Sequence, residues 1–143
     1  HTLDQIEAAD YSHKRILVVE DNDLNREIAM EILSMSGAQV ETAENGQEAV
    51  EMVKASEEGY YDLILMDLQM PIMNGYEATS AIRDMSREDI RNIPIVAMTA
   101  NAFLEDVQRS KACGMNEHMT KPLDIEQLQQ MLTRWLGKKK KDN

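Results

Sequence analysis

Residues 16–27 read ILVVEDNDLNRE, and this stretch decides the fold of the chain. Its first four residues are apolar, and a short apolar run bounded by charge is typical of a strand buried on both faces. Three carboxylates follow within four positions, at Glu20, Asp21 and Asp23. Apolar residues then recur at helical spacing, at Leu24, Ile28, Ile32 and Met35. The stretch therefore predicts a buried strand that ends on an acidic cluster, followed by a helix capped by Asn22 or Asp23.

The same alternation continues along the chain. Further strands are expected at residues 38–43, 61–67, 93–100 and 115–120. Helices are expected between and after them, at residues 46–59, 76–85, 102–114 and 124–137. Five strands that alternate with five helices predict an α/β fold in which helices cover both faces of a parallel sheet.

The composition of the 143 residues, 43% hydrophobic and 29% charged, is typical of one globular domain. A formal net charge of −11 argues against a nucleic-acid-binding surface, which needs clustered Lys and Arg. No apolar run approaches the roughly 18 residues of a membrane-spanning helix, so no direct membrane contact is expected. The single cysteine, Cys113, excludes an internal disulfide and fits a reducing compartment.

Reactive side chains stand where the predicted strands end. Glu20 and Asp21 follow the first strand, Asp67 ends the third, Thr99 ends the fourth, and Lys121 follows the fifth. In open α/β sheets, ligands bind outside the carboxyl ends of the strands. We therefore expect these side chains to meet at one edge of the sheet.

Two known acidic motifs partly match the cluster of Glu20, Asp21 and Asp23. An EF-hand calcium loop starting at Asp21 would need Gly where Arg26 stands and Glu where Ile32 stands, so it is excluded. A small aspartyl-nucleophile phosphatase would use a D-x-D-x-T pattern, which residues 21–25 match except that Asn25 replaces the Thr. The phosphatase stays as an alternative.

A magnesium pocket is the interpretation that gives a role to Glu20, Asp21, Asp67, Thr99 and Lys121 together. Mg²⁺ prefers a few carboxylates together with water and substrate oxygens, and Glu20, Asp21 and Asp67 would supply the carboxylates. Asp67 would then act as a nucleophile toward phosphorus. The Lys121 ammonium would offset charge on the phosphoryl oxygens, and the Thr99 hydroxyl would bind one of them.

Four motifs together resemble one family. They are Glu20-Asp21, MDLQMPIMNGYEA at 66–78, VAMTANA at 96–102 and TKPL at 120–123. In order and spacing they resemble the response-regulator receiver domain over nearly the whole chain. The resemblance implies a flavodoxin-like (βα)5 three-layer sandwich with strand order 2-1-3-4-5. We expect the receiver domain at residues 14–137, after a linker at 1–13 and before a basic tail at 138–143.

The resemblance also assigns chemistry to the site. It implies that Asp67 accepts a phosphoryl group from a phosphohistidine. It implies that Mg²⁺ is held by Asp21, Asp67 and the backbone carbonyl of Gln69, with Glu20 acting largely through water. The peptide bond before Pro122 is expected to be cis, which would aim Lys121 at the site.

Two further groups of residues are predicted, one to change conformation on phosphorylation and one to bind the partner. Thr99 and His118 are expected to form the switch, although the family more often has Tyr or Phe where His118 stands. A helical, histidine-bearing partner is expected to dock on Asn25, Ile28 and Pro122.

The predicted function is that of a phosphoacceptor in a two-component phosphorelay. The partner would be the phosphotransfer helices of a histidine kinase or a histidine phosphotransfer protein. The start at His1 and the motifs favour the C-terminal receiver of a hybrid sensor histidine kinase, with a free-standing single-domain regulator as the alternative. The isolated domain is not expected to be an enzyme beyond Mg²⁺-dependent self-phosphorylation. A cytoplasmic location is expected, either free or tethered through a membrane-bound parent kinase.

Overall fold

The computed structural model describes residues 11–100 and 103–137, and within them a five-stranded sheet forms the middle layer. The strands are β1 (Arg15–Val19), β2 (Gln39–Ala43), β3 (Leu63–Asp67), β4 (Ile95–Thr99) and β5 (Glu117–Thr120). All neighbouring pairs run parallel, in the order β2-β1-β3-β4-β5. The predicted fold and strand order are therefore confirmed.

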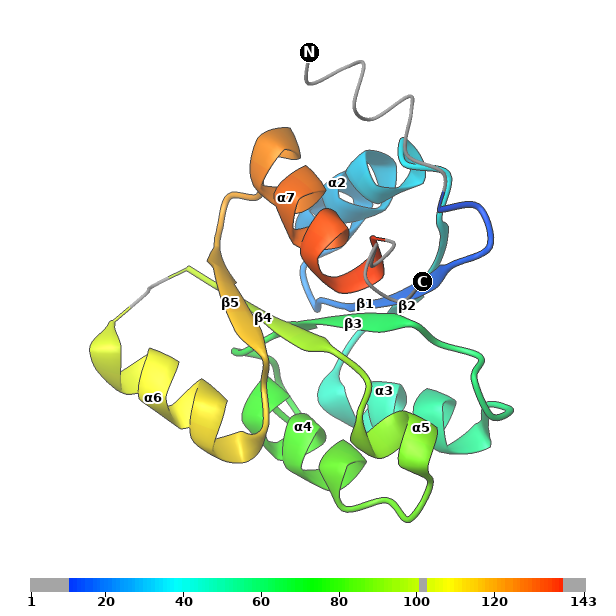
Figure 1. Ribbon diagram of the computed structural model, residues 1–143. Helices are drawn as coiled ribbons and strands as arrows, with labels where there is room; N and C mark the ends of the chain where they lie inside the picture. The colour runs from blue at the N-terminus through cyan, green and yellow to red at the C-terminus, as the bar shows by residue number, and fades with distance from the viewer. Residues whose placement is uncertain (1–10, 101–102, 138–143) are drawn as a thin grey trace.

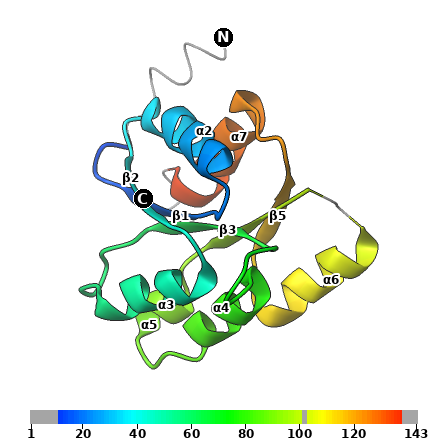
Figure 2. The same ribbon diagram turned by 180° about the vertical axis from the view of Figure 1, so that it is seen from behind.

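Helices cover both faces of this sheet (Figures 1 and 2). The described helices are α2 (Asp23–Ser34), α3 (Gly46–Ala55), α4 (Gly75–Arg83), α5 (Glu88–Arg91), α6 (Leu104–Cys113) and α7 (Ile125–Leu136). Helices α2 and α7 lie on one face, and α3, α4, α5 and α6 lie on the other (Figure 1). None of the helices in residues 11–100 and 103–137 is both long enough and apolar enough to cross a membrane.

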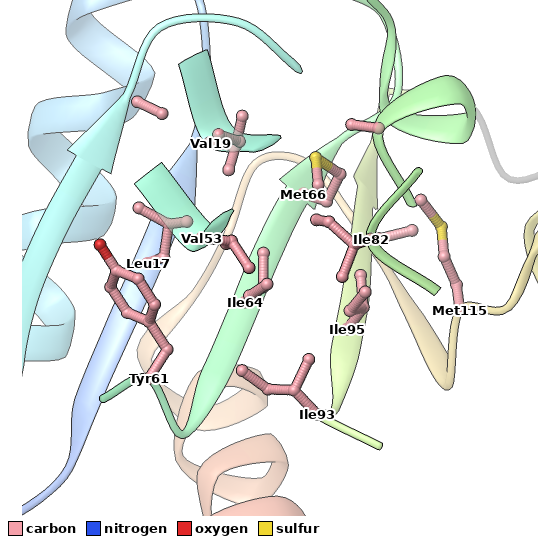
Figure 3. Packing of buried hydrophobic residues seen from close by; sticks show 14 of the residues in the cluster. Leu17, Val19, Val53, Tyr61, Ile64, Met66, Ile82, Ile93, Ile95 and Met115 are labelled. Atoms are coloured by element: carbon pink, nitrogen blue, oxygen red, sulfur yellow. The ribbon is translucent and has the colours of Figure 1, made fainter. Parts of the chain in front are cut away.

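The core consists of two apolar layers, because alternate residues of each strand point to opposite faces. On β3, Ile64 and Met66 pack beneath α3 and α4, together with Val53 and Ile82 (Figure 3). Leu63 and Leu65 point the other way and pack with side chains of α2 and α7. The central strands are thus buried on both faces, which explains why they read as unbroken apolar runs.

Helix α3 ends earlier than predicted, and α5 was not predicted. The expected helix over residues 46–59 ends at Ala55. Ser56 has an extended backbone, and its N–H and hydroxyl both donate to the Val53 carbonyl, which caps the helix end. Helix α5 is a single turn, anchored by the buried Ile90. One turn is too short to give a periodic pattern in the sequence.

The apolar spacing located α2 but only part of its buried face. Leu24 and Met35 are exposed, and Ile28 is exposed as its predicted docking role requires. Ala29 and Leu33 face the sheet, and Ile32 packs against the same layer. Asn22 is the residue that caps this helix, since its side chain accepts a hydrogen bond of 2.9 Å from the Asn25 N–H.

Tyr11 packs against the core, although it lies inside the stretch predicted as a linker. Its ring is buried against the layer under α2 and α7, and its N–H donates to the Ser36 carbonyl. The rest of the predicted linker, residues 1–10, and the basic tail at 138–143 lie outside the described residues.

Candidate functional site

Three carboxylates meet at the carboxyl edge of the sheet. Glu20 follows β1, and its N–H donates to the Ala43 carbonyl at the end of β2, which extends the ladder by one residue. Asp67 is the last residue of β3. Glu20 and Asp67 are 2% and 3% exposed, whereas Asp21 faces solvent. Ligand oxygens of the three residues all lie within 4.8 Å of one another, which suits a divalent cation.

Lys121 reaches this cluster from the end of β5. Its ammonium lies 2.7 Å from Glu20 Oε1 and 3.2 Å from Asp67 Oδ1. The Lys121 N–H donates to the Thr99 carbonyl at 2.8 Å, and the peptide bond to Pro122 is cis, as predicted. One cation is thus shared by two buried acids from different strands.

The electrostatics of the cluster oppose a charged Asp67. Burial, the hydrogen-bonded Glu20 and the negative charge of Glu20 raise the pKa of Asp67 to about 7, although Lys121 acts in the opposite direction. Burial alone would lower the pKa of the Lys121 ammonium, but its hydrogen bond to Glu20 and the charge of Asp67 raise it overall. A further positive charge at this position would therefore stabilise the ionised form of Asp67.

The start of α2 holds Glu20 in place, which the sequence did not reveal. The Asn22 N–H donates to Glu20 Oε2 at 3.1 Å, and the Arg26 guanidinium donates to the Glu20 backbone carbonyl at 2.9 Å. Arg26 also pairs with the exposed Asp23. The i, i+3 spacing of Asp23 and Arg26 was a visible signal of that pair, but the contact with Glu20 depends on the fold.

The loop between β3 and α4 folds back onto Asp67. The Gly75 N–H donates to the Leu68 carbonyl at 3.1 Å, and a Cβ at Gly75 would lie 2.2 Å from the Asp67 backbone oxygen. Only glycine allows this approach. The Gln69 N–H lies 3.4 Å from Asp67 Oδ1, while the role of the Gln69 carbonyl as a metal ligand stays a prediction.

The two residues predicted as a switch lie on neighbouring strands. Thr99 is buried at the end of β4, one residue beyond the partner of Asp67 in the ladder. His118 is the partner of Ala97 on β5, so its side chain points to the same face as Ala97, toward the layer under α4 and α6. His118 Nε2 is buried and has no hydrogen-bond partner among the described residues.

The residues predicted to dock a partner flank the carboxylates. Asn25 and Ile28 lie in the first turns of α2, where Asn25 is half-buried and Ile28 is exposed. Pro122 is exposed in the segment after β5. All three follow strands whose ends form the site, so the structure groups them around it, while their contact with a partner stays a prediction.

A protein-family model matches most of the chain. Residues 16–133 match the response regulator receiver domain. The chain belongs to this family. Among curated relatives of the receiver, hybrid signal transduction histidine kinase B of Dictyostelium discoideum is 43% identical over 132 residues, which cover 85% of this chain and 7% of the kinase. The chain thus corresponds to a small part of a much longer relative.

Two solved receiver domains show the same architecture. The receiver domain of sensor histidine kinase PA1611 from Pseudomonas aeruginosa PAO1 has a magnesium ion coordinated in its active-site cleft. It is 38% identical, with a TM-score of 0.77 over 87% of this chain and 98% of that one. The receiver domain of Saccharomyces cerevisiae Ssk1, crystallised with the histidine phosphotransfer protein Ypd1, is 35% identical, with a TM-score of 0.76 over 85% of this chain and 88% of that one.

Proposed function

We propose that this receiver domain accepts a phosphoryl group on Asp67 from a phosphohistidine in a two-component phosphorelay. The observation that carries the proposal is the placement of Asp67, which ends a buried strand within contact of Lys121 and beside Glu20 and Asp21. A strand-end carboxylate with no chemical role would not need a buried cation and two further acids around it.

The proposed step is a transfer between two protein side chains. A carboxylate oxygen of Asp67 forms a bond to phosphorus, the bond from phosphorus to the imidazole nitrogen breaks, and that nitrogen keeps the electron pair. Lys121, 3.2 Å from Asp67 Oδ1, can exchange this contact for one with a phosphoryl oxygen. The buried Thr99 hydroxyl is proposed to bind another phosphoryl oxygen.

We propose Mg²⁺ as the cofactor, held by Asp21, Asp67 and the Gln69 carbonyl, with Glu20 acting largely through water. The raised pKa of Asp67 supports this assignment, because a divalent cation would favour the carboxylate that reacts. When bound, Mg²⁺ supplies positive charge that offsets the charge of the incoming phosphoryl group.

Thr99 and His118 are proposed to report the phosphorylation. Movement of Thr99 toward the phosphoryl group would free space for the His118 imidazole and reshape the surface around α6 and β5. Support comes from His118 Nε2, which is buried without a partner among the described residues, so its present position is not fixed by a hydrogen bond at that atom. An identical His118 rotamer with and without a bound phosphate mimic would contradict this role.

The proposed partner is a histidine phosphotransfer protein or the phosphotransfer helices of a histidine kinase. It would dock on Asn25, Ile28 and Pro122. Similarity to hybrid kinases supports an origin in a hybrid sensor histidine kinase, and the Ssk1–Ypd1 complex supports the partner class. The free thiol of Cys113 fits the proposed cytoplasmic location.

The deciding experiment is intact mass spectrometry after incubation with acetyl phosphate. The expected result is one phosphoryl adduct that requires Mg²⁺ and is absent in Asp67→Asn. An adduct that persists in Asp67→Asn would place the acceptor elsewhere. Continuous release of inorganic phosphate without an adduct would instead favour the aspartyl-nucleophile phosphatase.

A further inference from the structure

Ile72 has a backbone conformation that its side chain disfavours. It lies in the loop between β3 and α4 with φ +70°, and it is the only non-glycine residue with positive φ among the described residues. Glycine adopts a positive φ freely, whereas a β-branched residue there is a genuine outlier. The loop beside the acceptor thus holds Ile72 in a strained backbone conformation.

The strained conformation is set by the loop rather than by Ile72. The Met73 N–H donates to the Pro71 carbonyl at 2.7 Å, which closes a tight turn around Ile72. The Met73 carbonyl accepts a hydrogen bond of 3.0 Å from the Gly46 N–H at the start of α3. These bonds use only backbone atoms, so a residue without β-branching at position 72 would keep them with less strain.

Packing does not compensate for this strain. The side chain of Ile72 is 79% exposed, more than any other large hydrophobic residue in the described parts of the chain. An isoleucine that is both strained and exposed contributes little to folding, which directs attention to function.

The position of Ile72 suggests what it contacts. The loop starts at Asp67 and returns to it at Gly75, so Ile72 lies at the tip of a short loop beside the acceptor. Leu24 and Phe103 are 64% and 65% exposed, and they lie in the segments that follow β1 and β4. Exposed apolar side chains thus follow three of the strands that end at the acidic site.

We propose that Ile72 is a docking determinant that contacts an apolar surface of the histidine phosphotransfer protein during transfer to Asp67. This inference rests on the proposed function. Asp67 is only 3% exposed, so a protein donor must press against the surrounding loops to reach it. A small donor such as acetyl phosphate has no protein surface for Ile72 to contact, so transfer from it should not depend on Ile72.

Two donors and three variants test this assignment. Ile72→Asn removes the apolar side chain and relieves the strain, whereas Ile72→Leu keeps an apolar side chain without β-branching. Met35→Asn is the matched control, because Met35 is 51% exposed but lies at the far end of α2. Phosphorylation is measured with acetyl phosphate and, separately, with phosphorylated Ypd1 from Saccharomyces cerevisiae at increasing concentration.

For Ile72→Asn we expect an unchanged rate with acetyl phosphate and a higher unfolding midpoint. The Ypd1 concentration that gives half-maximal transfer should rise about tenfold, while the maximal rate stays the same. Ile72→Leu and Met35→Asn should transfer from Ypd1 like the wild type.

Equal half-maximal concentrations for Ile72→Asn and the wild type would overturn the proposal. So would a wild-type chain that accepts from acetyl phosphate but not from Ypd1, because the assigned partner class would then be wrong. Failure with both donors would count against the proposed function itself.

Discussion

Lys121 donates a hydrogen bond of 2.7 Å to Glu20, a residue 101 positions earlier in the chain. The same ammonium lies 3.2 Å from Asp67 Oδ1. Glu20 follows β1 and Lys121 follows β5, so the contact joins two strand ends that β3 and β4 separate in the sheet. The pair neutralises part of the acidic cluster and leaves Lys121 within reach of a group that arrives on Asp67.

Replacement of Lys121 by Met should reduce phosphorylation of Asp67 by about 100-fold, the usual order for loss of one charged donor to a reacting oxyanion. Initial rates of adduct formation from acetyl phosphate at saturating Mg²⁺ measure this effect. Lys121→Arg keeps the charge and should recover part of the rate. Equal rates for Lys121→Met and the wild type would exclude a role for the ammonium in the transfer.

The stability of the metal-free protein should depend on the ionisation of Asp67. The pKa of Asp67 rises from 3.8 to about 7 in the folded protein, chiefly through burial. An acid with a raised pKa binds its proton more tightly in the folded state. The free energy of unfolding should therefore fall as the pH rises from about 4 to about 7, by an amount on the order of 4 kcal/mol.

Asp67→Asn is the matched control for this pH dependence. The amide does not ionise, so the variant should be more stable than the wild type at pH 8 without metal, and the difference should vanish near pH 4. Urea denaturation at several pH values measures both proteins. If the free energy of unfolding changed with pH in the same way for both proteins, the pKa of Asp67 would not be raised in the folded state. Added Mg²⁺ should stabilise the wild type more than the variant at pH 8.

Arg83 should contribute to stability without affecting the chemistry. Its guanidinium donates hydrogen bonds of 2.9 Å to the Gly114 and Arg91 carbonyls and of 2.8 Å to Asn116 Oδ1, so it joins the ends of α4, α5 and α6. Asn116 in turn accepts from the Ile95 N–H, at the opposite end of β4 from Thr99.

Arg83→Met should lower the free energy of unfolding by about 2 kcal/mol, because partly exposed acceptors on three segments lose a shared charged donor. The phosphorylation rate of the folded variant should match the wild type. Arg83→Lys should recover only part of the stability, since one ammonium cannot replace the guanidinium fork. A stability loss below about 0.5 kcal/mol in Arg83→Met would show that these hydrogen bonds are individually weak.

The sequence predicted the sheet and the main site residues for one physical reason. Central parallel strands are buried on both faces, so they stand out as apolar runs, and the residues at their ends must meet at one edge. Asp67 and Lys121 were found in this way. Their mutual contact follows from the strand order. The family motifs implied this order, whereas the hydrophobic periodicity of the sequence alone did not.

Features that depend on tertiary contacts were beyond the sequence. Arg83 reads as an ordinary helix-end arginine, and its acceptors other than Asn116 Oδ1 are backbone carbonyls that carry no sequence signal. Part of the buried face of α2 was missed because small Ala29 faces the sheet while larger Leu24 faces solvent. The left-handed conformation of Ile72 was equally hidden, since isoleucine rarely adopts it.

Gly75→Ala should disturb the acceptor through the backbone alone. A methyl group at this position would lie 2.2 Å from the Asp67 backbone oxygen and 3.0 Å from Met66 Cγ, so α4 or the end of β3 must move. Overpacking of this kind typically costs about 1–3 kcal/mol. A shift of Asp67 relative to Lys121 should also slow phosphorylation from acetyl phosphate by at least about tenfold, because positioning errors raise the barrier.

Gly59→Ala is the control, since its φ of +77° strains an added side chain but nothing lies within 4 Å of it. That variant should lose a comparable amount of stability in urea denaturation and keep the wild-type phosphorylation rate. If both variants phosphorylate at the wild-type rate, close contact between Gly75 and Asp67 does not position the acceptor.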